Sequence, residues 1–469
     1  MTPEIYQQTA LDHYFSMIRR KARRAVPKGL AKVPALNEAM FSYQADVTDY
    51  LLRVGCGAGF LDTGMGKALI GLEWGRVIGE ATNKPVLMLA PLAVGPQHAR
   101  EAARFGIDAA YVRDASKAKT PIVITNYERM HLFDPDMFGG LVCDESSIVK
   151  SFGGKTSKNL MAFAERIPYV LALTATPAPN DHMELGQHSQ LLRVMASNEM
   201  LARWFVADQA QMGRYRLKHH GVADFWSWVA SWARMAARPS DLGYSDVGFE
   251  RPGHQVDLHY VDADLRAGAA YDELFRHVDT SATSIHKEKR RTAGARATRI
   301  GELIANDPNE LWCIWCDTDY EADELMRAIP GAVEVRGSMH PDMKEERLVD
   351  FIDGKIQYLV TKPDIAGFGL NLQHVARCAF VGVSFSYERF YQAIRRFDRF
   401  GQTRKVQVHV ALAETESVIW NTIQRKARDH EIMKEAMTAA MRREVAKRET
   451  KTAYIPRQVA RLPQWLAAA

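Results

Sequence analysis

Short apolar runs alternate with stretches of helical periodicity along most of this 469-residue chain. Continuous apolar runs of this length are typical of strands that are buried on both faces. In the first half, we expect such strands at residues 85–90, 121–125, 140–143 and 169–173. A second block begins near His254, with strands expected at residues 312–316, 332–335, 357–361, 378–383 and 406–412. Strands that alternate with helices predict an α/β fold, in which parallel sheets are covered by helices on both faces.

The segment between the two blocks has a different pattern. Phe225, Trp228, Trp232 and Met235 fall at helical spacing. This spacing indicates an aromatic stripe that faces the protein core, and a platform for stacking nucleic-acid bases is the alternative.

These changes of pattern divide the chain into five expected segments. They are a basic helical segment at 1–35, a first α/β domain at 36–194, a helical insertion at 195–253, a second α/β domain at 254–425 and a basic helical tail at 426–469.

The composition excludes several classes of protein. With 47% hydrophobic and 25% charged residues, the chain has the composition of a soluble globular protein, and no apolar stretch approaches the ~20 residues of a membrane span. Five cysteines do not suggest a disulfide framework. Cys313 and Cys316 form a CxxC inside an apolar run, so we interpret them as buried strand residues rather than a metal or redox site. We expect a cytoplasmic protein with no membrane partner.

The charge distribution suggests a polyanionic partner. The net charge is +5, and basic residues cluster near 19–24, 286–291 and 442–451. Such clusters neutralise nucleic-acid phosphates, although each could equally be a solvated helix face.

Residues 61–69 (LDTGMGKAL) have the pattern of a phosphate-binding loop. Glycines allow backbone N–H groups to point inward, the following helix adds its positive N-terminus, and Lys67 reaches the outer phosphates. Ala68 departs from the pattern, because a Ser or Thr hydroxyl normally binds Mg²⁺ at this position. The loop therefore predicts a nucleoside triphosphate site with weakened metal binding.

Asp144 and Glu145 follow the third expected strand. Asp144 would hold Mg²⁺ directly or through water, and Glu145 would polarise the water that attacks the γ-phosphate. An isolated Asp-Glu pair is often only a turn or a helix cap. Because ligands bind at the carboxyl ends of parallel strands, we expect this pair, the phosphate loop and residues 174–176 to converge on one site.

Two arginines in residues 391–402 (YQAIRRFDRFGQ) suit a transferring phosphoryl group. If this segment is helical, Arg396 and Arg399 lie on one face. They belong to the second domain, so they would complete the site only when the two domains close on each other. A salt-bridged surface face is the alternative.

The phosphate loop, the Asp-Glu pair and the arginine segment together resemble the motifs of the superfamily-two helicases. Within this family, they are most similar to the compact Swi/Snf-type DNA translocases known from bacteriophages. The resemblance covers about 36–425 and follows helicase motifs in order. They are Tyr43-Gln44 (motif Q), 63–67 (I), 90–92 (Ia), 124–128 (Ib), 144–147 (II), 174–177 with Asn180 (III), 367–372 (V) and 392–402 (VI).

The resemblance implies two RecA-like domains with ATP and Mg²⁺ in the cleft between them. It implies a catalytic set made of Lys67, Asp144, Glu145, Arg396 and Arg399, with Asp144 as metal ligand. The implied nucleotide contacts are Gln44, Thr63, Gly64, Met65, Gly66, Lys67, Ala68, Gly369 and Gln392. The implied nucleic-acid contacts are Pro91, Thr125, Asn126, Lys362 and Asn371.

The function expected from the resemblance is a DNA-dependent ATPase that translocates on, or unwinds, duplex or branched DNA in a bacterial or phage-infected cell. An ATP-gated DNA clamp with weak hydrolysis is the alternative, because of Ala68. An RNA helicase is a third possibility, although the usual HRxGRxGR pattern of RNA helicases is absent from motif VI.

Overall fold

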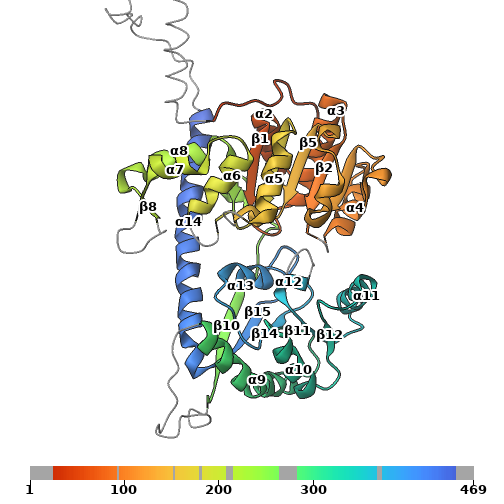
Figure 1. The fold of residues 1–469 in the computed structure, drawn as a ribbon, viewed down its shortest axis with the longest axis vertical. Helices are drawn as coiled ribbons and strands as arrows, with labels where there is room; N and C mark the ends of the chain where they lie inside the picture. Colours follow the sequence, from red (N-terminus) through yellow and green to blue (C-terminus); the bar gives the residue numbers. More distant parts are fainter. Residues whose placement is uncertain are drawn as a thin grey trace, which may run out of the picture.

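The computed structural model describes residues 25–91, 94–150, 154–178, 182–207, 215–263, 282–366 and 372–449. These residues form two parallel β-sheets, each covered by helices, with one long helix running beside both (Figure 1). The architecture is α/β with two tandem RecA-like domains, as the sequence predicts.

The first sheet has seven parallel strands in the order β3-β4-β2-β5-β6-β1-β9. The strands are β1 (Cys56–Leu61), β2 (Val86–Ala90), β3 (Ala109–Tyr111), β4 (Ile122–Asn126), β5 (Gly140–Asp144), β6 (Tyr169–Thr174) and β9 (Ala233–Ala236). The four apolar runs expected as strands are confirmed as β2, β4, β5 and β6. Apolar clusters on both faces bury these strands, which explains why their sequences do not alternate.

Within the described residues, seven α-helices accompany this sheet. They are α2 (Ser42–Val54), α3 (Lys67–Thr82), α4 (Gly95–Arg104), α5 (Lys155–Glu165), α6 (Leu185–Leu191), α7 (Ser197–Trp204) and α8 (Val222–Val229). Helices α2 and α3 pack on one face with Trp74 buried, whereas α5 to α8 pack on the other face with Trp228.

The helical insertion expected at 195–253 is corrected in part. Besides α7 and α8, this segment contains an antiparallel hairpin of β7 (Phe205–Ala207) and β8 (Tyr215–Leu217), and β9 is an edge strand of the first sheet. Strand β9 pairs with β1 from Ala58↔Ala233 to Leu61↔Ala236. A four-residue strand is too short for periodicity to reveal, and its tertiary pairing with β1 decides its conformation.

The aromatic stripe is buried, which confirms the interpretation that it faces the core. Phe225 and Trp228 lie on α8, Trp232 follows that helix, and Met235 lies in β9. The Trp228 and Trp232 rings are 5.4 Å apart, and Trp232 lies 5.9 Å from Phe60 of β1.

The second sheet has six parallel strands in the order β10-β15-β14-β11-β13-β12. The strands are β10 (His254–Val261), β11 (Trp312–Trp315), β12 (Val333–Val335), β13 (Tyr358–Thr361), β14 (Arg377–Phe380) and β15 (Val406–Ala413). The associated helices are α9 (Ala282–Ala305), α10 (Asp319–Ala328), α11 (Pro341–Ile352), α12 (Pro363–Ala366) and α13 (Tyr387–Ile394). All five strands expected in this block form, which confirms that prediction.

The cysteines of the second domain are structural. Cys313, Cys316 and Cys378 are buried free thiols, as expected for the CxxC pair. Within the described part of the chain, no group of three His, Cys, Asp or Glu residues is placed to hold a metal ion. No described helix combines the length and apolar character needed to cross a bilayer.

Helix α14 (Ser417–Glu449) runs alongside both domains (Figure 1). Ile419 and Trp420 near its start belong to the core of the second domain, whereas Met433 and Met437 belong to a core cluster of the first. The boundary expected at 425 therefore falls inside one continuous helix. This helix contributes core residues to both domains.

Candidate functional site

The phosphate loop connects β1 to α3. Gly64 and Gly66 have φ angles of 87° and 74°, a left-handed conformation that favours glycine. Lys67 begins α3, and its Nζ donates to the carbonyl oxygens of Leu61 at 2.9 Å and Asp62 at 3.3 Å. A turning backbone, a helix N-terminus and an ammonium group thus converge in the manner of an anion site. Burial lowers the pKa of Lys67, and the nearby carboxylates of Glu145 and Asp144 oppose this shift.

Gln44, an expected nucleotide contact, lies against the phosphate loop. Its Oε1 accepts from the Phe41 N–H at 2.9 Å, and its Nε2 approaches the Met65 carbonyl oxygen at 3.4 Å. The Tyr43 hydroxyl donates to the same carbonyl at 3.1 Å. A Cβ atom at Gly66 would lie only 1.9 Å from Gln44 Nε2, so a side chain there would displace the Gln44 amide from the loop, and the φ angle separately favours glycine.

Asp144 ends β5 and is held by two neighbours. His98 of α4 donates from Nε2 to Asp144 Oδ2 at 2.8 Å, and the Tyr127 hydroxyl donates to the Asp144 carbonyl oxygen at 2.6 Å. Although burial opposes the charge on His98, its bond to Asp144 raises the pKa of His98 to about 9. Burial likewise opposes the charge on Asp144, but His98 holds the pKa of that carboxyl below its usual value. Asp144 is therefore an anion, as a metal ligand must be.

Glu145 has a backbone φ of 51°, which is uncommon for a residue other than glycine. This conformation costs on the order of 1 kcal/mol and is characteristic of functional sites. The Thr174 hydroxyl, at the end of β6, lies 3.4 Å from Glu145 Oε2. Burial raises the pKa of Glu145, with Lys67 opposing and Asp144 reinforcing the shift. A carboxylate with a raised pKa is a stronger proton acceptor.

Arg396 approaches Glu145 from the second domain. Its Nη2 lies 3.9 Å from Glu145 Oε1, and both side chains are largely buried. Arg399 is half-buried near Glu101 of α4, and burial together with Arg396 lowers its pKa to about 10. The structure thus brings both arginines to the edge of the first domain that carries the loop.

The condition that residues 391–402 form one helix, on which Arg396 and Arg399 would share a face, is not met. Helix α13 ends at Ile394, and the chain continues in tight turns. The Phe397 N–H donates to the Ile394 carbonyl oxygen at 3.0 Å, and the Arg396 carbonyl oxygen accepts from the Leu372 N–H at 3.2 Å. This last tertiary bond uses a carbonyl group that a continuing helix would occupy.

Gln392 bridges the domains through its amide. Its Nε2 donates to Thr176 Oγ1 of the first domain at 3.3 Å and to Glu388 Oε1 at 3.4 Å. It therefore contacts the motif that follows β6, and the structure gives it no contact with the phosphate loop among the described residues.

A cavity of about 310 Å³ lies beside the loop. Three segments line it, namely the loop at 63–65, the connector between the domains at 237–251, and Phe400. The Phe249 ring lies 5.2 Å from the rings of both Phe41 and Phe400. Residues 237–251 carry no recognisable motif, so the position of the connector beside the loop is not predictable from the sequence.

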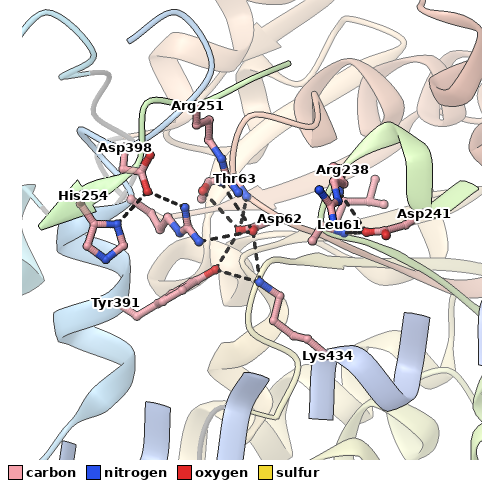
Figure 2. A network of polar contacts seen from close by, with 12 residues as sticks. Leu61, Asp62, Thr63, Arg238, Asp241, Arg251, His254, Tyr391, Asp398 and Lys434 are labelled. Atoms are coloured by element: carbon pink, nitrogen blue, oxygen red, sulfur yellow. Dashed lines mark hydrogen bonds and ion pairs between the residues drawn. The ribbon is translucent and has the colours of Figure 1, made fainter. Parts of the chain in front are cut away.

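A buried carboxylate, Asp62, joins the loop to distant parts of the chain (Figure 2). Its Oδ1 accepts from the Thr63 N–H at 2.8 Å and from the Tyr391 hydroxyl at 2.9 Å. Its Oδ2 lies 3.3 Å from Lys434 Nζ, 3.7 Å from Arg251 Nη1 and 3.8 Å from Arg395 Nη2. Burial would raise the pKa of Asp62, but these three cations hold it well below its usual range. None of the three was expected from the sequence.

The residues expected to contact nucleic acid differ in their exposure in the structure. Thr125 and Asn126 are buried, and Asn126 Oδ1 accepts from the Arg129 N–H at 3.0 Å to begin a short 3-10 helix. Neither side chain is open to a ligand in this structure, and their contact with nucleic acid stays a prediction. Pro91 is half-buried after β2, and Lys362 pairs with Asp319 at 2.8 Å. Asn180, Gly369 and Asn371 lie outside the described residues.

The residues beside the loop supply a carboxylate that suits Mg²⁺, but they lack the usual hydroxyl ligand. Mg²⁺ sites in nucleotide-binding proteins use one or two carboxylates together with phosphate oxygens and water, and Asp144 supplies an anionic carboxylate beside the loop. Ala68, in the first turn of α3, offers no hydroxyl.

Comparison with known protein families gives one match. Residues 295–401 match the family described as helicase conserved C-terminal domain, a region that runs from within α9 to the end of the turns carrying Arg396 and Arg399. No curated protein matches the chain at a significant level. The second RecA-like domain thus contains a region that is similar to the helicase conserved C-terminal domain.

Proposed function

We propose that this chain is a DNA-dependent ATPase that uses ATP hydrolysis in the cleft between its domains to translocate along duplex DNA. The observation that carries this proposal is the approach of Arg396 to Glu145 across the two domains. The helicase match supports nucleic-acid-dependent activity in general, and DNA as the substrate follows from the Swi/Snf-like form of motif VI.

The roles of the residues follow from their positions. The backbone of residues 63–67 and the ammonium group of Lys67 bind the phosphates. Asp144, kept ionised by His98, would hold Mg²⁺, which when bound supplies charge neutralisation at the β- and γ-phosphates. Glu145 orients the attacking water and accepts its proton while the bond from the γ-phosphorus to the ADP oxygen breaks. Arg396 and Arg399 stabilise the negative charge that spreads over the transferring phosphoryl group.

Motion between the domains is the expected link between chemistry and stepping. The arginines belong to the second domain and the loop belongs to the first, so hydrolysis depends on how closely the domains approach. DNA would be held mainly through its phosphates, which makes binding insensitive to sequence and sensitive to salt. The exposed basic residues at the start of α9 are candidates for such contacts, namely His286, Lys287, Arg290 and Arg291.

Steady-state phosphate release tests the proposal. We expect duplex DNA to stimulate turnover at least about tenfold, and RNA of the same length to stimulate it far less. Equal stimulation by RNA would instead favour an RNA helicase. Absence of stimulation by any nucleic acid would reject a nucleic-acid-dependent ATPase.

Ala68 favours a second candidate, an ATP-gated DNA clamp. Without a hydroxyl ligand, Mg²⁺ is held less firmly, and the chain would bind ATP and DNA yet hydrolyse ATP slowly. ATP-dependent DNA binding without measurable turnover would identify the clamp.

A further inference from the structure

Helix α14 reaches the phosphate loop through one lysine. Lys434 Nζ lies 3.3 Å from Asp62 Oδ2 and 3.5 Å from the Tyr391 hydroxyl. The Lys434 side chain is 17% exposed and that of Asp62 only 2%, so water screens their ion pair weakly. Figure 2 shows Lys434 pointing from α14 toward Asp62 on the side opposite Arg251. The two paired residues are separated by 372 positions in the sequence.

Asp62 controls the start of the loop through its backbone as well as its carboxylate. Its carbonyl oxygen accepts from Lys67 Nζ and from the Met65 N–H, both at 3.3 Å. Its N–H donates to the Ala236 carbonyl oxygen at 3.0 Å. A shift of Asp62 therefore moves the support of the Lys67 ammonium group and the first turn of the loop together.

Lys434 makes the shortest of the three ion pairs to Asp62, and it is the only one of the three cations on α14. Arg395 divides its guanidinium between Asp62 and Asp398, with the Asp398 contact shorter at 2.8 Å. Among the residues that the structure describes, the one other carboxylate paired with Lys434 is Glu431, which is 3.9 Å away and exposed. The charge of Lys434 is therefore directed mainly at Asp62.

The backbone of α14 transmits this contact to the rest of the molecule. Met433 and Met437, which flank Lys434, are buried in the core of the first domain, and Arg442 pairs with Asp241 at 3.1 Å. The other end of α14 is fixed in the core of the second domain by Ile419. A helix of 33 residues spans about 50 Å. Any change in the distance between the domains must strain or shift one of these attachments.

We propose that Lys434 is a positioning residue of the nucleotide site. It holds Asp62, and through Asp62 it holds the phosphate loop in the arrangement that binds phosphate. Lys434 can do so only while α14 is docked on the first domain. The inference rests on the proposed function in one respect, that the loop binds ATP. Because coupling between two sites is reciprocal, nucleotide on the loop also strengthens the docking of α14.

Two measurements on the full-length chain test this inference. Hydrogen exchange of the amides at 62–67 is followed without nucleotide, and the affinity for a fluorescent ATP analogue is measured separately. Lys434→Met keeps the aliphatic stem and removes the charge. We expect about 5- to 20-fold faster exchange at 62–67 and a similar loss of nucleotide affinity. Lys434→Arg keeps the charge and should leave both the exchange rate and the nucleotide affinity close to those of the wild type. The matched control Arg428→Met, on the exposed face of the same helix, should change neither quantity.

A double variant separates a direct link from general loosening. If Lys434 acts through Asp62, adding Lys434→Met to Asp62→Asn causes no further increase in exchange at 62–67. Additive effects, or unchanged exchange in Lys434→Met, would overturn the inference. A wild-type chain that binds no nucleotide would overturn the proposed function instead, and the exchange measurement would still decide whether Lys434 holds the loop.

Discussion

Arg396 of the second domain lies 3.9 Å from Glu145 of the first, and both side chains are largely buried. Burial lowers the pKa of Arg396 and raises that of Glu145, and the opposite charge of each group partly opposes the shift of the other, with Lys67 the larger opposing charge at Glu145. This geometry places an arginine beside the carboxylate proposed to activate water. It also makes the site dependent on both domains.

Replacement of Arg396 should impair chemistry more than binding. We expect Arg396→Ala to lower kcat for ATP hydrolysis by about 10³-fold, as loss of a charge-stabilising arginine does in other phosphoryl-transfer sites. The affinity for ATP should fall less than tenfold. Arg404→Ala is the matched control, because Arg404 lies in the same domain and pairs with Glu310 at the surface. Wild-type turnover in Arg396→Ala would remove this arginine from the mechanism.

The apolar runs were sufficient to predict most of the strands, because strands buried on both faces carry continuous apolar sequence. Phe225 and Trp228 were likewise placed in the core from their spacing alone. Tertiary contacts decided the features that the sequence did not predict. Strand β9 exists through its pairing with β1, and the turns at Arg396 are fixed by a bond to Leu372.

The His98–Asp144 pair predicts a pH-dependent contribution to stability. The folded chain raises the pKa of His98 to about 9, above its ordinary value of 6.5, so it binds this proton more tightly than the unfolded chain does. The contribution is therefore complete below about pH 6.5 and is lost as the pH rises through about 9. Free energies of unfolding can be measured by urea titration from pH 6 to 9.5. Over this range the wild type should lose on the order of 2 kcal/mol more free energy of unfolding than His98→Asn does. Parallel curves for the two proteins would contradict the pairing.

Removal of the cation from a buried ion network should destabilise the second domain. Arg296 is fully buried, with Nη1 2.9 Å from Glu321 Oε1 and Nε 3.5 Å from Glu416 Oε2. Arg296→Met removes the cation that lies between the two buried carboxylates and leaves Glu321 the longer contact with Lys289 at 3.8 Å, so we expect it to destabilise the domain by about 3–5 kcal/mol. Arg299→Met removes an exposed pair with Glu302 on the same helix and should cost less than about 1 kcal/mol. Equal unfolding midpoints for these two variants would show that the network adds little.

Ala68 should set the metal requirement of the enzyme. Ala68→Thr restores a hydroxyl in the first turn of α3, and we expect the Mg²⁺ concentration for half-maximal turnover to fall several-fold. The control is Ala81→Thr, at an exposed position near the end of the same helix and far from the loop along its axis. An unchanged Mg²⁺ dependence in Ala68→Thr would mean that the chain holds the metal without this ligand.

The loop and the Asp144-Glu145 pair could be predicted from the sequence, since their chemistry requires particular residue types at fixed spacing. The groups that position them could not. His98, Arg251 and Lys434 belong to no motif, and they reach the site because the fold brings together segments that lie far apart in the chain. The roles of these three residues depend on where their side chains point and how deeply they are buried. The spacing of residues along the sequence does not reveal either property.

Phosphate release by the wild type and by Glu145→Gln, each with and without duplex DNA, tests the central claim most directly. The account predicts turnover by the wild type that rises with DNA, and a loss of about 10²- to 10⁴-fold in Glu145→Gln with ATP binding retained. Glu199→Gln, at an exposed position on α7, should match the wild type. Wild-type turnover no higher than that of Glu145→Gln would contradict the assignment of this chain as an ATPase motor.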